Sequence, residues 1–160
     1  MHQYLHSLFE TFAHAAAEAR ETGDKYRLID RVYQQLDELA LFPLPEVLGC
    51  ILALIERFPE LDYGGPGPFG TYIEEHRLSE YTPALLASIH RQPSIQTLGW
   101  LDRTMGVENF QNGLGTNPVS PAQFAQALEQ VIAGTQATPA CREFAESCLS
   151  DLKKNGLIDA

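Results

Sequence analysis

Residues 81–103 read YTPALLASIHRQPSIQTLGWLDR, a stretch with the pattern of two helices joined by a tight turn. A proline such as Pro83 suits the first turn of a helix, where its missing N–H costs no hydrogen bond. Pro93 interrupts the helical spacing of the apolar side chains that precede and follow it. The stretch therefore predicts one helix over 83–91 and a second, leucine-lined helix over 94–105.

The same proline signal recurs along the chain at a constant interval. Pro45, Pro83 and Pro121 follow one another at intervals of 38 residues, and each is expected where a helix begins. A period near 40 residues with two helices per unit is typical of HEAT-type solenoids. With ten prolines in the chain, a chance alignment is the alternative, and the second helices do not keep the interval.

Apolar side chains at helical spacing extend this interpretation to nearly the whole chain. The sequence predicts a single all-α domain over 1–160, in which about seven or eight helices form antiparallel hairpins stacked as a short HEAT-like α-solenoid. An N-terminal helical pair occupies 1–42, and three hairpins occupy 45–160 with an inserted loop at 106–119. Within that loop Asn112–Gly113 would suit the turn of a small β-hairpin. The helices are predicted over 2–20, 24–42, 45–58, 69–76, 83–91, 94–105, 121–133 and 139–154.

Composition limits the classes of function. The net charge of −10 repels nucleic acid and anionic membranes and attracts basic partners, although solubility alone also explains it. No apolar stretch approaches the ~20 residues of a membrane span, and the N-terminus lacks a secretory signal pattern. Three cysteines without disulfide-scaffold density indicate a reducing compartment, so a cytoplasmic protein is expected.

The glycine-rich run DYGGPGPFGT at 62–71 raises the question of a phosphate-binding loop. Its G-x-x-x-x-G frame from Gly65 to Gly70 matches a P-loop, but no lysine follows and a helix precedes it instead of a strand. Pro66 and Pro68 also remove backbone N–H donors that would hold a phosphate. A bend between two helices is the preferred interpretation.

No motif predicts catalysis or a cofactor. His2 and His6 have the i, i+4 spacing of metal ligands, but two ligands rarely hold a metal and the chain end frays. The three cysteines, Cys50, Cys141 and Cys148, lie on apolar helical faces where a thiol acts as a small hydrophobe. We therefore expect a protein that is not an enzyme and has neither a metal nor another cofactor.

Candidate partner-binding residues fall into three groups. The first is an acidic ridge around an aromatic residue, although Glu74 and Glu75 taken singly are better explained as a solvated face. The second is the side of the 94–105 helix opposite Leu98, and the third lies in the long loop. Trp100 is open to two interpretations, an interface residue or a core residue between repeats. In order, the groups are Asp62, Tyr63, Glu74 and Glu75; Gln96, Trp100 and Arg103; and Glu108 and Phe110.

Two segments, DYGGPGPFGTYIEEH and YTPALLASIHRQPSIQTLGWLDRTMG, resemble segments of small bacterial immunity proteins of the HEAT-like helical kind. Such proteins accompany polymorphic toxins of contact-dependent inhibition and secreted-effector systems. The resemblance covers about residues 45–106. It implies a cytoplasmic, non-enzymatic protein that binds and blocks one toxin domain. For an acidic protein, a basic toxin such as a nuclease is the expected partner.

Two other functions stay open at this stage. A helical-repeat adaptor or scaffold would bind a peptide or a cellular enzyme on a long concave surface. A metal-dependent hydrolase on a helical array is the third and weakest interpretation. The sequence does not indicate the oligomeric state.

Overall fold

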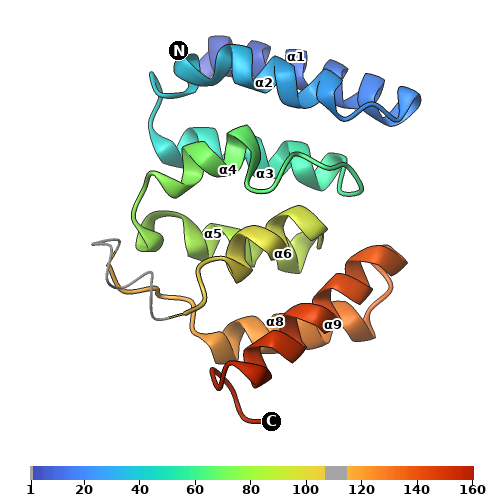
Figure 1. The fold of residues 1–160 in the computed structure, drawn as a ribbon. Coiled ribbons are helices and arrows are strands. Elements are labelled where there is room, and N and C mark those ends of the chain that lie inside the picture. The colour runs from blue at the N-terminus through green and yellow to red at the C-terminus, as the bar shows by residue number, and fades with distance from the viewer. Residues whose placement is uncertain (1, 107–114) are drawn as a thin grey trace. The chain divides into compact units, whose positions relative to one another are not determined.

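The computed structural model describes residues 2–106 and 115–160, apart from the side chain of His2, and its regular structure there is entirely helical (Figure 1). The all-α prediction is confirmed. The helices are α1 (His2–Thr22), α2 (Tyr26–Leu39), α3 (Leu44–Arg57), α4 (Gly67–Glu74), α5 (Leu78–Arg91), α6 (Ile95–Asp102), α8 (Pro121–Ala133) and α9 (Pro139–Lys154). The chain, which was expected to form a single domain, divides into two compact units, Met1–Glu75 and His76–Ala160.

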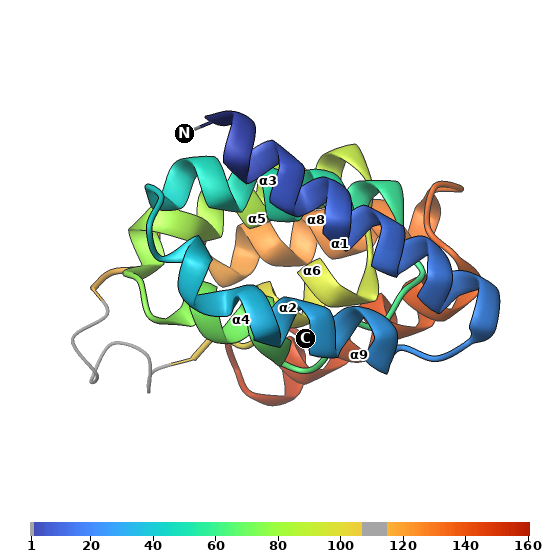
Figure 2. The same ribbon diagram turned by 90° about the horizontal axis from the view of Figure 1, so that it is seen from above.

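The N-terminal unit consists of two helical hairpins. Helix α1 packs on α2, and α3 packs on α4; between the hairpins, α1 contacts α3 and α2 contacts α4. Seen from above, α1 and α3 lie on one side of this unit and α2 and α4 on the other (Figure 2). First helices pack on first helices and second on second, which is how repeated hairpins form two layers.

An aromatic cluster fills the core of this unit. The Phe69 ring of α4 lies 6.0 Å from the Phe9 ring and 5.8 Å from the Phe12 ring, both on α1. Phe12 and Phe69 are completely buried. Offset and edge-on ring pairs at such distances add stability beyond the burial of apolar area.

The C-terminal unit repeats the arrangement. Helix α5 packs on α6 and α8 on α9, while α5 contacts α8 and α6 contacts α9. Side-chain caps begin three of its helices: the hydroxyls of Ser94, Ser120 and Thr138 accept backbone N–H groups of Thr97, Gln123 and Cys141. Each cap satisfies a donor that the first turn of a helix otherwise leaves unpaired.

The prediction that all three evenly spaced prolines begin helices is wrong for Pro83. Helix α5 begins at Leu78, because Leu78 and Tyr81 are buried and the Glu80 carboxylate accepts the Arg77 N–H at 2.9 Å. Pro83 lies inside α5, where it removes one hydrogen bond of the i→i−4 series. The first residues of α3 and α5 are 34 positions apart and those of α5 and α8 are 43 apart, so the hairpins repeat without the 38-residue period.

The glycine-rich run is a bend, as the sequence predicted. It connects helix α3 to helix α4, and Gly64 and Gly67 adopt positive φ angles of 96° and 77°. At Gly64 a side chain would also collide with the Gly67 backbone, since a Cβ there would lie 2.7 Å from the Gly67 Cα. Only glycine fits both requirements at this position.

Candidate functional site

The two units differ sharply in charge. Residues 1–75 contain 13 acidic and 5 basic side chains, a net charge of −8, whereas residues 76–160 contain 8 acidic and 6 basic side chains, a net charge of −2. The acidity that the sequence showed for the whole chain therefore belongs mainly to the N-terminal unit. A surface with this imbalance attracts positively charged partners over a Debye length of ~8–10 Å.

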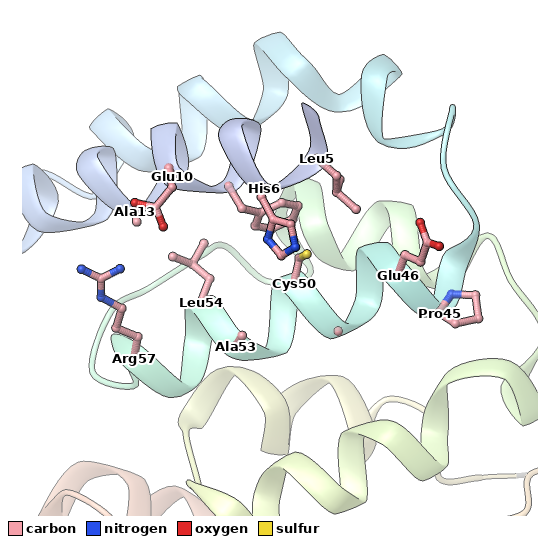
Figure 3. Close-up of a pocket in the computed structure, with 12 residues that line it drawn as sticks. Leu5, His6, Glu10, Ala13, Pro45, Glu46, Cys50, Ala53, Leu54 and Arg57 are labelled. Carbon is pink, nitrogen blue, oxygen red and sulfur yellow. The ribbon is translucent and has the colours of Figure 1, made fainter. Parts of the chain in front are cut away.

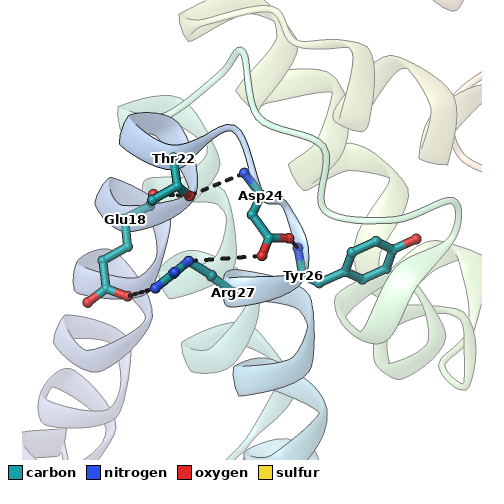
Figure 4. Close-up of polar contacts among 5 residues, drawn as sticks. All are labelled: Glu18, Thr22, Asp24, Tyr26 and Arg27. Atoms are coloured by element: carbon teal, nitrogen blue, oxygen red, sulfur yellow. Dashed lines mark hydrogen bonds and ion pairs between the residues drawn. The ribbon is translucent and has the colours of Figure 1, made fainter.

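Several charges of the N-terminal unit neutralise one another where α1 ends and α2 begins (Figure 4). The Thr22 hydroxyl donates to the Glu18 carbonyl and accepts the Asp24 N–H. The Asp24 carboxylate accepts the Tyr26 N–H at 3.1 Å, whereas Lys25, which directly precedes the helix, makes no side-chain cap. Arg27 lies 3.7 Å from the Glu18 carboxylate and 3.9 Å from that of Asp24.

The predicted site residue Asp62 is exposed, but it is engaged within the chain. Its carboxylate accepts the Gly64 N–H at 2.8 Å and lies 2.9 Å from the Lys25 ammonium group. Both contacts lower the pKa of Asp62, and the lysine contributes most. A second ion pair, Arg20 to Glu60 at 2.6 Å, joins α1 to the same loop. Asp62 thus helps to fix the α3–α4 loop to the turn between α1 and α2.

Tyr63 was predicted to bind a partner, but its side chain is buried. Its side chain is 1% exposed and its ring lies 6.2 Å from that of Phe69. The phenol donates to the Phe58 carbonyl at 2.9 Å, and burial raises its pKa. Because the loop folds back onto the core, Tyr63 satisfies a backbone acceptor there and is not available to a partner.

The other predicted residues are distributed over both units. Glu74 ends α4 and is half-buried, and Glu75 follows it and is exposed. In the C-terminal unit, Arg103 is exposed, whereas Gln96 and Trp100 are buried, with Trp100 2% exposed. The core interpretation of Trp100 is correct, since α6 has α5 on one side and α9 on another. Glu108, Phe110 and the predicted Asn112–Gly113 turn lie outside the described residues.

A groove of about 500 Å³ runs between α1 and α3 of the N-terminal unit (Figure 3). The groove stays open because several residues that line it are small, namely Ala13, Gly49 and Ala53. Leu54 and Phe9 form part of its apolar lining. Glu10 and Arg57 lie toward one end, and Glu46 lies toward the other. The groove has room for an apolar side chain with polar groups at either end.

Cys50 and His6 both line this groove. Burial and the neighbouring Glu46 raise the pKa of Cys50, the thiol that faces the groove, so little thiolate forms near neutral pH. Within the part of the chain that the structure describes, no three His, Cys, Asp or Glu side chains gather in a way that would hold a metal ion. The His2 half of the predicted histidine pair lies outside the described side chains.

The cysteines of α9 are packed in the core, as expected. Burial raises the pKa of Cys141 to about 11 and that of Cys148 to about 12, and the Cys148 thiol donates a hydrogen bond to Asp102. Burial and the nearby Asp151 raise the pKa of Asp102 as well. Thiols in this state are poor nucleophiles.

The outer face of α2 was not among the surfaces predicted from the sequence. Five large hydrophobic side chains are exposed among the described residues, and four of them, Tyr4, Tyr26, Tyr33 and Leu41, belong to the first hairpin or directly follow it. Tyr4 is engaged, because its phenol donates to Glu38 and its ring stacks on Phe42. The sequence could have indicated this exposed face, because Tyr26 and Tyr33 are spaced so that they lie on the side of α2 away from Leu28 and Val32.

Comparisons with models of protein families, with curated proteins and with solved structures each gave no match. Among the helices that the structure describes, none combines the length and the apolar character that crossing a bilayer requires. The helices and their contacts define an all-helical protein of repeated hairpins, with an acidic N-terminal unit.

Proposed function

We propose that this chain is an immunity protein, which binds a basic toxin domain through its N-terminal unit and blocks the toxin's active site. The observation that carries the proposal is the uneven charge, with −8 of the total −10 in residues 1–75. Complementary potentials accelerate association and select the correct partner. Nucleases are suitable candidates, since a domain that holds nucleic acid carries a basic surface.

The resemblance of residues 45–106 to HEAT-like immunity proteins agrees with this function. It also implies that the protein acts in the cytoplasm and without catalysis of its own. The groove chemistry is compatible with a binding role, because its thiol is not activated and apolar side chains dominate its lining.

Co-expression tests this function directly. The chain is produced together with the C-terminal domain of the toxin encoded immediately upstream, and growth is scored against cells that produce the toxin domain alone. The proposal predicts restored growth and a complex that survives gel filtration. If both proteins are soluble and growth still fails, the chain is not the immunity protein for that toxin.

A second candidate function, a peptide-binding adaptor, is favoured by the groove between α1 and α3. An apolar groove between two helices suits the anchor side chain of a helical or extended peptide. Gly49 offers a clean test, since a Cβ added there meets no heavy atom within 4 Å. Gly49→Leu would fill the groove, and Gly49→Ala is the matched control.

The adaptor function predicts that a displayed peptide library yields binders to the wild-type protein, that Gly49→Leu abolishes their binding and that Gly49→Ala preserves it. Equal binding to all three proteins would place the peptide elsewhere. If no peptide is selected, the groove between α1 and α3 no longer supports an adaptor function. Neither result would affect the toxin co-expression assay, so the two functions are tested separately.

A further inference from the structure

The outer face of α2 carries an alternating series of tyrosine and aspartate. Tyr26, Asp30, Tyr33 and Asp37 follow one another at intervals of four, three and four residues, which places them on one side of the helix. All four are exposed, with Tyr26 57% and Tyr33 53% accessible. We call these four residues the tyrosine–aspartate face.

The basic residues beside this face differ in how far they neutralise its two aspartates. Arg27 is held by Glu18 and Asp24, at 3.7 and 3.9 Å. Arg31 is exposed one turn further along and, with Arg27, lines a hollow that Tyr26 and Asp30 also line. The Lys25 ammonium group lies over the Tyr26 ring, 5.5 Å from its centroid, and is paired with Asp62. The tyrosine–aspartate face thus presents the Tyr33 ring and two carboxylates beside a tyrosine that already has a cation over it, with Arg27 and Arg31 along one edge.

We propose that the tyrosine–aspartate face of α2 docks on a lysine- and arginine-rich protein surface. This assignment rests on the proposed function, for which it names the recognition surface. Tyrosine supplies a large contact area and is enriched among the residues that dominate binding energy. The Tyr33 ring can also accept a cation over its face, and an aspartate can bind the guanidinium group of an arginine through two hydrogen bonds.

Charge decides between this partner and a second copy of the chain. Pairing two identical faces around a twofold axis would bring four aspartates together within units that each carry −8, and like charges in contact are unfavourable. A basic surface removes this repulsion and gains attraction from the whole N-terminal unit.

The test measures the affinity and association rate of an active-site-inactivated form of the upstream-encoded toxin domain for four variants of the full chain. Tyr33→Ala is expected to weaken binding at least about tenfold, as for a residue at an interface centre. Asp30→Lys/Asp37→Lys is expected to slow association about tenfold or more at low salt. The matched control, Glu129→Lys/Glu143→Lys, makes the same change in net charge at exposed positions of the C-terminal unit and should stay within about twofold.

The fourth variant, Arg31→Glu, tests whether the partner surface that meets this edge is basic or acidic. A basic partner predicts unchanged or faster association, whereas slower association would mean that this edge meets an acidic surface. Circular dichroism and thermal unfolding confirm that each exposed substitution leaves the fold intact.

The outcomes separate the two proposals. If the wild-type chain binds and the Tyr33 and Asp30/Asp37 variants lose affinity while the control does not, the face is confirmed. If all variants bind like the wild type, the recognition surface lies elsewhere and the immunity function stands. If the wild-type chain itself does not bind, the immunity function fails and this assignment fails with it.

Discussion

The two compact units have the same internal plan but different helix starts. In both, two hairpins pack with first helix on first helix and second on second. In the N-terminal unit, α3 and α4 begin at Pro43–Pro45 and Pro66–Pro68, without side-chain caps. In the C-terminal unit, Ser94, Ser120 and Thr138 cap α6, α8 and α9.

Their surfaces differ more than their cores. The N-terminal unit carries most of the net charge, the groove and the exposed tyrosines of α2, whereas the C-terminal unit is close to neutral. One packing plan thus supports two different surfaces, and function must be sought in those surfaces because a fold alone does not imply it.

The largest effect is expected where the units are most alike, in their cores. Phe69→Ala and Phe124→Ala each remove a completely buried ring, one from each unit, and each should cost about 3–5 kcal/mol of unfolding free energy. Urea titration of the full chain measures the loss. An exposed ring, Tyr33, is the control, and a core substitution that costs no more than Tyr33→Ala would mean that the ring is not packed as described.

The helix starts should respond to substitution by different mechanisms. Ser120→Ala and Thr138→Ala each remove a hydroxyl that accepts a backbone N–H, at a cost of about 1 kcal/mol. Pro45→Ala in the N-terminal unit removes no such bond and should cost about 0.4–1 kcal/mol through the entropy of the unfolded chain. Ser120→Thr, which keeps the cap, should be nearly neutral; if it costs as much as Ser120→Ala, the cap is not the cause.

Asp102, in the C-terminal unit, should make the stability of the protein depend on pH. Burial and Asp151 raise its pKa in the folded protein, so stability is lost as the pH rises from about 4 through the folded pKa. Asp102→Asn should therefore stabilise the protein at pH 7 by about 0.3–1 kcal/mol, since it also removes a carboxylate from the C-terminus of α6. Thermal unfolding between pH 4 and 7 should show the gain shrinking toward pH 4, and a gain that is constant with pH would contradict the charge argument.

The smallest effect is expected at the surface ion pair between Lys25 and Asp62. Asp62→Asn removes the charge but keeps an oxygen that can accept the Gly64 N–H, and exposed pairs contribute little. Because the pKa of Asp62 is lowered, whatever the pair contributes is present at neutral pH and lost as the pH falls below about 4. A loss of stability at pH 7 larger than that of Ser120→Ala would show that the loop depends on this charge.

Helix boundaries were predictable where local signals were complete. Ser120–Pro121 and Thr138–Pro139 place a cap directly before a proline, and the predicted ranges 121–133 and 139–154 match α8 and α9. The start of α5 was not predictable in this way. Arg77 cannot act as a side-chain acceptor, and the capping contact comes from the side chain of Glu80 three residues later.

The candidate site was harder to predict than the fold, because burial depends on tertiary contacts. Tyr63 lies in a glycine- and proline-rich loop, where exposure is the usual expectation, yet its ring packs on Phe69. Trp100 lies opposite the leucines of α6, but neighbouring helices cover more than one side of that short helix. By contrast, Tyr26 and Tyr33 lie on the polar side of an amphipathic helix, so the apolar periodicity alone could have predicted that they are exposed.

We have proposed that a basic toxin domain binds to the N-terminal unit. The most direct measurement is a titration of the ¹⁵N-labelled full chain with the inactivated toxin domain, followed through the backbone amide signals. Binding through the N-terminal unit predicts amide shifts that are concentrated in residues 1–75, strongest along α2, and progressively lost as the salt concentration is raised. Shifts concentrated in residues 76–160, or a spectrum unchanged by a toxin domain that the chain neutralises in cells, would contradict it.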